Sequence, residues 1–207
     1  VVLFHLAFNV ALAVAFIFFT APIARVAERL LPTKPPSDDP AKPRHLDPSA
    51  LATPTLAISC AAREALRIGD VIEQMLHGML VVLKTNDRAL AERLRKMDDI
   101  VDELYTAIKL YLTQISREAL EEAEGRRWTD IISLTINMEQ VGDIIERIIT
   151  DIEDKKIDKG RNFSEAGLAE IFDLHTRLIA NLRLGLAVFL NGDLKSAQEL
   201  LAQKVLF

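Results

Sequence analysis

The sequence predicts an all-α protein in which one transmembrane helix is followed by an antiparallel helical bundle. Three observations support this fold class. An uncharged apolar run opens the chain, a proline-rich stretch follows it, and apolar residues then recur every three to four positions up to the end. Glycine is scarce, at 8 of 207 residues, which is typical of long uninterrupted helices.

Composition excludes several classes of protein. The formal net charge of −5 argues against a nucleic-acid partner, because nucleic-acid binders usually present a basic patch. The single cysteine, Cys60, leaves no intramolecular disulfide and no cysteine-based zinc site. No glycine-rich phosphate loop and no nucleophile elbow is present, so we expect no enzyme.

The first predicted region, residues 1–31, holds the transmembrane helix. The run Val1–Ile23 contains no Asp, Glu, Lys or Arg and has the length of about 20 apolar residues that a bilayer core requires. Arg25 and Arg29 follow it and favour a cytoplasmic location for the rest of the chain. Asn9 inside the run is typical of a helix that faces other membrane helices. A secretory signal would need a basic segment before the run, and a buried soluble helix remains an alternative.

The second predicted region, residues 32–54, is a linker. It contains seven of the eight prolines of the chain, interleaved with Lys, Arg and Asp. This composition predicts an extended, solvated tether between a membrane part and a soluble part.

The third predicted region, residues 55–207, is a helical domain. Three long helices with short connections suggest an antiparallel bundle, and two more helices follow. The turn before the second helix resembles the turn before the fifth, which indicates a weak internal repeat whose second copy is incomplete. The expected helices cover about 55–83, 90–115, 128–152 and 165–190, with a last one after 193.

Two pairs of carboxylates carry the chemistry of this domain. Asp98 and Asp102 lie four residues apart on the second predicted helix, and Glu139 and Asp143 do so on the third. Residues at this spacing share a helix face, so each pair repels itself unless a cation lies between its members. Carboxylate oxygens are hard ligands that suit Mg, Mn or Fe. The competing interpretation is a solvated acidic face, in which nearby arginines form surface ion pairs.

The glycine inside the second pair is also informative. Gly142 costs about 1 kcal/mol relative to alanine in a helix. It either lets another helix approach closely or keeps space open beside the acids, and tolerated drift remains an alternative. A di-iron enzyme is disfavoured because the chain has no Glu-x-x-His motif.

The segment Met138–Ile145 resembles the Leu-Glu-Arg-Ile-Gly-Asp-His-Ala signature of PhoU-like domains, which are phosphate-uptake regulators built from three-helix repeats. Ile144 and Ile145 replace the His-Ala of that signature. The segments 5–9 and 22–25 are similar to the last membrane helix of the sodium/phosphate cotransporter family. The resemblance spans the chain, which lacks an initiator methionine, so we expect the C-terminal part of a bacterial member.

This resemblance implies a function. The chain would belong to a sodium-dependent inorganic phosphate transporter and carry a cytoplasmic PhoU-like regulatory domain on a multi-pass inner-membrane protein. Sodium, as coupling ion, and phosphate would be handled upstream of Val1. A second copy of the chain or a phosphate-signalling protein is the expected partner. The alternative is a membrane-tethered signalling or scaffold protein, a PhoU-like phosphate-response regulator without transport activity. The metal ligands would be Asp98, Asp102, Glu139 and Asp143.

Overall fold

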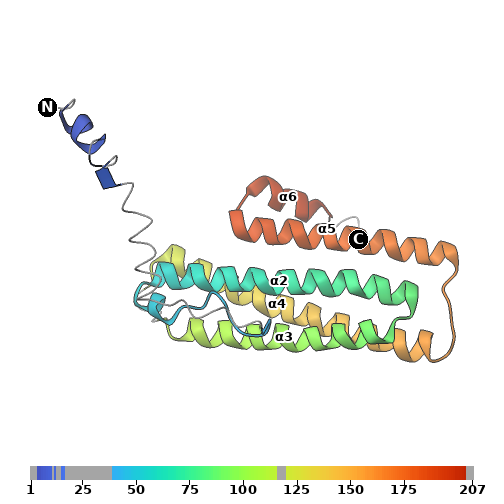
Figure 1. Cartoon of the computed structure of the whole chain (residues 1–207). Helices are drawn as coiled ribbons and strands as arrows, with labels where there is room; N and C mark the ends of the chain where they lie inside the picture. The colour runs from blue at the N-terminus through green and yellow to red at the C-terminus, as the bar shows by residue number, and fades with distance from the viewer. Residues whose placement is uncertain (1–3, 11, 13–14, 17–38, 116–119, 204–207) are drawn as a thin grey trace. The chain divides into compact units, whose positions relative to one another are not determined.

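The computed structural model describes residues 4–10, 12, 15–16, 39–115 and 120–203, and every regular element in them is a helix (Figure 1). The chain divides into two compact units, residues 1–38 and 39–207. In the first unit, residues 4–10 are helical. The all-α prediction and the five helices predicted after the linker are confirmed.

The prediction of a multi-pass inner-membrane protein with a cytoplasmic C-terminal domain is corrected by the structure. No helix in the described ranges is both long enough and apolar enough to cross a bilayer. The long helices of the second unit carry charged residues along their length, whereas a spanning helix needs about 20 mainly apolar residues. The transmembrane helix expected within 1–31 is therefore unsupported, and residues 1–3, 11, 13–14 and 17–31 lie outside the described part.

Helix α2, Pro54–Thr85, is the central element of the second unit. It has Pro54 in its first turn, where proline costs no hydrogen bond, and it ends at Asn86, whose φ of 59° closes the helix in the left-handed conformation. A short 3₁₀ helix, η1 (Pro48–Ala52), precedes it. Eight apolar residues spaced three or four positions apart form a buried stripe along this helix: Ala57, Ala61, Ala65, Ile68, Ile72, Met75, Met79 and Val82.

Two further helices complete an up-down bundle around α2. Helix α3, Arg88–Thr113, begins at Asp87, whose side chain accepts a hydrogen bond from the Leu90 N–H. Helix α4, Glu122–Ile152, begins with a capping box in which the side chains of Glu121 and Glu124 satisfy each other's backbone N–H groups. Helices α2, α3 and α4 pack against one another in all three pairings (Figure 1).

The chain continues from α4 through a five-residue π-helix, η3 (Glu153–Ile157). Helix α5, Glu165–Asn191, then packs on α2, and α6, Leu194–Gln203, packs on α5 (Figure 1). Polar contacts fasten α5 to α2: the buried His175 Nε2 lies 2.9 Å from the carbonyl oxygen of Leu76, and Arg183 donates to Glu73. The reading of α5 and α6 as an incomplete second repeat stays a prediction.

Candidate metal centre

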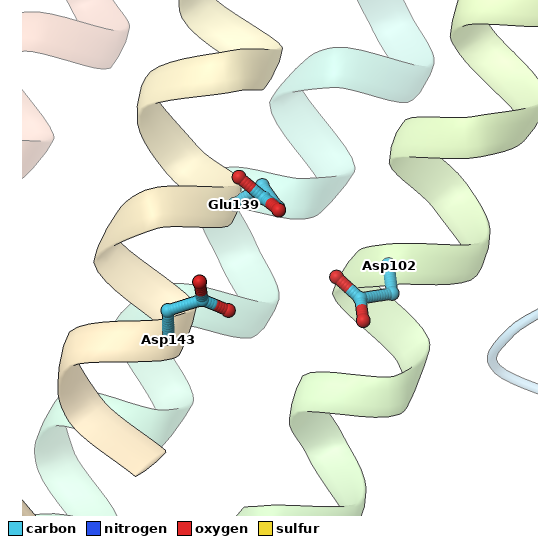
Figure 2. Close-up of side chains that lie close together, drawn as sticks. All are labelled: Asp102, Glu139 and Asp143. Atoms are coloured by element: carbon cyan, nitrogen blue, oxygen red, sulfur yellow. The ribbon is translucent and has the colours of Figure 1, made fainter. Parts of the chain in front are cut away.

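Three of the four predicted carboxylates come together where α3 faces α4. Asp102 on α3 points toward Glu139 and Asp143 on α4 (Figure 2). One carboxylate oxygen from each residue lies within 4.8 Å of the other two. The pairing arises because consecutive antiparallel helices place the acidic faces predicted for each of them side by side. The donor set is all oxygen, which fits a hard divalent cation.

The acids are not neutralised by the arginines that a solvated acidic face would need. Arg95 donates to Glu153 at 2.5 Å instead. Neither Arg95 nor Arg147 forms an ion pair with any of the four acids in the described part of the chain. Repulsion is therefore built into the cluster.

The acidic cluster changes the proton affinity of its members. Burial raises the pKa of Asp102, and the charges of Asp143 and Asp99 raise it further. Burial and then repulsion from Asp143 and Asp102 raise the pKa of Glu139, while the charge of Lys109 lowers it. A cation at this position would offset the part of each increase that comes from repulsion between the carboxylates.

Asp98, the fourth predicted ligand, is buried and does not belong to the group formed by Asp102, Glu139 and Asp143. Its side chain is only 8% exposed, and its Oδ1 is buried without a hydrogen-bond partner. It fits against Gly142, where an added Cβ would lie 2.4 Å from that oxygen. Gly142 thus provides the space that the carboxyl group occupies, as one of the two interpretations of the glycine predicted.

The buried carboxyl group of Asp98 resists ionisation. Its pKa rises from 3.8 to about 7, first because of burial and further because of repulsion from Asp102, Asp143, Glu146 and Asp99. An orphaned acceptor at the edge of three carboxylates needs either a proton or a nearby positive charge. Glu146, one turn from Gly142 along α4, also raises the pKa of Asp98, and the spacing of the acidic pairs did not predict this effect.

The linker lies next to this centre, which sequence reasoning missed. Residues 41–43 form one wall of a groove of about 420 Å³ whose other wall belongs to α3. Asp102 and Glu103 line that groove together with Thr106, Ala107 and Leu110. No local pattern in the sequence predicts this groove, because its two walls lie about 60 positions apart along the chain.

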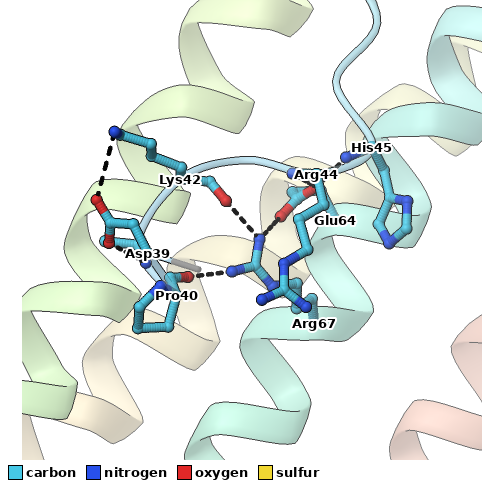
Figure 3. A network of polar contacts seen from close by, with 8 residues as sticks. Asp39, Pro40, Lys42, Arg44, His45, Glu64 and Arg67 are labelled. Atoms are coloured by element: carbon cyan, nitrogen blue, oxygen red, sulfur yellow. Dashed lines mark hydrogen bonds and ion pairs between the residues drawn. The ribbon is translucent and has the colours of Figure 1, made fainter. Parts of the chain in front are cut away.

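A buried charge network holds the linker in place (Figure 3). Glu64 of α2 is fully buried, and its Oε2 accepts from the backbone N–H groups of Arg44 (2.9 Å) and His45 (2.7 Å). Its Oε1 accepts from Arg67 at 2.5 Å. Arg67 also donates to the carbonyl oxygens of Lys42, at 2.8 Å, and Pro40. We call these contacts the Glu64–Arg67 clamp.

A comparison with known protein families identifies the class of this helical bundle. A family profile described as PhoU domain matches residues 65–152, from within α2 to the last residue of α4. These residues form a PhoU domain, and the predicted PhoU-like resemblance is confirmed.

The relatives are named for phosphate. Over 204 residues the chain is 44% identical to "Putative inorganic phosphate export protein YjbB" from Escherichia coli strain K12, and 45% identical to the protein of the same name from Salmonella typhimurium. Each alignment covers 99% of this chain and 37% of the relative, so the chain spans little more than a third of the curated relatives it matches. No solved structure matches.

These findings correct the functional prediction. The expectation that the chain belongs to a sodium-dependent phosphate transporter is wrong, because the relatives that align across 99% of the chain are named for export of inorganic phosphate. The resemblance of segments 5–9 and 22–25 to the sodium/phosphate cotransporter family is not confirmed, and this removes the reason for assigning sodium as the coupling ion. The alternative, a PhoU-like phosphate-response regulator, fits better.

Replacing Asp98 by asparagine should change how stability depends on pH in the metal-free protein. Between the ordinary pKa of 3.8 and the folded pKa of about 7, the folded state binds more protons at Asp98 than the unfolded state does. The free energy of unfolding therefore falls as pH rises through this interval. Asp98→Asn removes that part of the fall in urea titrations with chelator, whereas Asp130→Asn, an exposed acid on α4, retains it. Parallel pH curves for Asp98→Asn and wild type would contradict this assignment.

Removing Glu64 should both destabilise the protein and release the linker. The change Glu64→Ala leaves two backbone N–H groups and the Arg67 guanidinium without their acceptor. We expect a loss on the order of 3 kcal/mol in urea unfolding, as for other broken buried charge pairs, and faster proteolysis within residues 39–47. Arg63→Ala, an exposed neighbour on the same helix, is the control and should leave both unchanged.

Proposed function

We propose that this chain is a PhoU-like regulatory module of inorganic phosphate export and not an enzyme. The PhoU domain at residues 65–152 and the printed names of the relatives support this proposal. The module would respond to the state of the cell through a cation bound between α3 and α4. A second copy of the chain and a phosphate-signalling protein remain the predicted partners.

The cation would be Mg, Mn or Fe, held by Asp102, Glu139 and Asp143, with Asp98 next to them. The observation that carries this part is the convergence of three carboxylate oxygens within 4.8 Å, beside a buried carboxylate oxygen that has no partner. A divalent cation supplies positive charge that offsets the mutual repulsion of these groups and joins two helices. Glu139 and Asp143 would hold the cation from α4, and Asp102 would hold it from α3, so the packing of the two helices sets the position of the cation.

The contact between the centre and the linker supports a regulatory function. Residues 41–43 line the same groove as Asp102, and the Glu64–Arg67 clamp fixes this segment to α2. A change in charge or position at Asp102 therefore acts on a segment that leads directly toward the N-terminal unit. In this way cation binding would be transmitted along the chain.

Cation binding is tested on the full chain by calorimetry with MnCl₂ and by metal analysis. Wild type should bind, and the double variant Asp102→Asn with Glu139→Gln should lose at least about tenfold in affinity, since about 1.4 kcal/mol is tenfold and two charged ligands are removed. The matched control is Asp130→Asn with Glu122→Gln, two exposed acids on α4 away from the centre. Equal binding by the double variant and wild type would refute the centre.

Transmission to the linker is tested by hydrogen exchange. Adding MnCl₂ should change the exchange of the backbone N–H groups of residues 41–47 in wild type, because their groove includes Asp102. The double variant should show no such change. Cation binding without any change in residues 41–47 would leave the centre standing and reject its regulatory link to the linker.

A further inference from the structure

A second pocket lies at the end of α4, away from the carboxylates. Its volume is about 390 Å³, within the range of small-molecule sites. The residues that line it come from the last turns of α4, from η3 and from the loop before α5: Ile148, Asp151, Ile152, Lys155, Lys156, Arg161, Asn162 and Phe163.

The pocket has two walls with separate structural supports. Ile148, Asp151, Ile152 and Lys155 follow the spacing of a single helix face and form the first wall. The loop that forms the second wall is folded back by its own backbone, because the N–H of Arg161 donates to the carbonyl oxygen of Lys156 at 2.8 Å. The fold thus builds the pocket without a ligand.

The π-helix beneath the pocket is tied to the neighbouring helix α3. Arg95 pairs with Glu153, the first residue of the π-helix, and Arg88 pairs with Asp158, the residue that follows it. Single π turns inside helices are frequent at functional sites, since they redirect side chains that an α-helix would place elsewhere. Here the irregular turn places Lys155 and Lys156 on the same pocket.

The lining carries excess positive charge in a chain whose net charge is −5. Lys156 is only 8% exposed, and its ammonium group donates to Asn86, a neutral amide, so no carboxylate balances it. Lys155 pairs with Asp151 at 2.8 Å. The guanidinium of Arg161 has no ion pair in the described part of the chain. Buried charges are normally paired, so an unbalanced ammonium next to a free guanidinium favours an anion.

Apart from Asn162, the remaining lining is apolar. Ile152 is buried, while Ile148 and Phe163 are 39% and 48% exposed. Apolar surface of this kind gains nothing from a small hydrated anion such as inorganic phosphate. It matches a ligand that carries a ring or short hydrocarbon part beside its charge.

We propose that this pocket binds a small organic anion in which a charged group is joined to an apolar part. Arg161 and Lys156 face the charged group, and Phe163 and Ile148 contact the apolar part. The site is separate from the carboxylate centre in charge and in chemistry, so it stands or falls independently of the proposed cation site.

Phenyl phosphate is a suitable probe, since it combines a dianion with a ring. Added to the full chain and followed by ¹⁵N NMR, it should shift the signals of residues 148–163 and bind roughly tenfold more tightly than inorganic phosphate or benzyl alcohol, a difference of about 1.4 kcal/mol. Benzoate in place of phenyl phosphate shows whether a carboxylate serves equally well.

Two exposed side chains separate the two parts of the interaction. Arg161→Ala should weaken phenyl phosphate binding about tenfold, as expected for a lost charge-assisted hydrogen bond. Phe163→Ala should weaken phenyl phosphate but leave the weak binding of inorganic phosphate unchanged. Lys159→Ala, on the same loop but outside the pocket, is the control. No binding, binding that Arg161→Ala does not weaken, or inorganic phosphate binding as tightly as phenyl phosphate would overturn the proposal.

Discussion

The buried face of α2 is the constraint on which the rest of the second unit depends. The same helix packs against α3, α4 and α5, so its apolar stripe fixes where each of them lies. Two features of function rest on this face as well. Glu64 lies on it and holds the linker, and the side chain of Ile72 packs under Gly142, close to the carboxyl group of Asp98. Core packing and the candidate centre are therefore parts of one arrangement.

This constraint explains why the acids remain together despite their repulsion. Packing of α3 and α4 on a common third helix brings Asp102 to Glu139 and Asp143, and the apolar burial behind them outweighs the unfavourable charge contacts. Burial, and then repulsion between the carboxylates, raises the pKa values of Asp98, Asp102 and Glu139. Helix packing holds these carboxylates together despite their repulsion. A bound cation would relieve this repulsion without any rearrangement of the helices.

Sequence periodicity predicted the helices, and residue spacing placed one acidic pair on each of two consecutive helices, because both features depend on residues within one helix. It did not predict that Asp98 would be buried while its partner Asp102 stays exposed, since this depends on how α3 is rotated against Gly142. Periodicity also could not predict the Glu64–Arg67 clamp, because Glu64 accepts hydrogen bonds from backbone N–H groups 19 and 20 residues away. The predicted sodium-dependent phosphate transporter was wrong, because that prediction came from a resemblance of the N-terminal segments and not from a described site.

Helix α4 connects the two sites by its distribution of charge. Its acidic members, Glu139, Asp143 and Glu146, precede the basic pocket residues Lys155 and Lys156. Cations at the carboxyl end of a helix interact favourably with its dipole, which accounts for lysines at this place in the sequence but not for the burial of Lys156 without a carboxylate partner. Nor does the dipole account for Arg161, which lies beyond η3 and lines the pocket. Arg161, together with the buried ammonium of Lys156, distinguishes an anion site from ordinary stabilisation of a helix end.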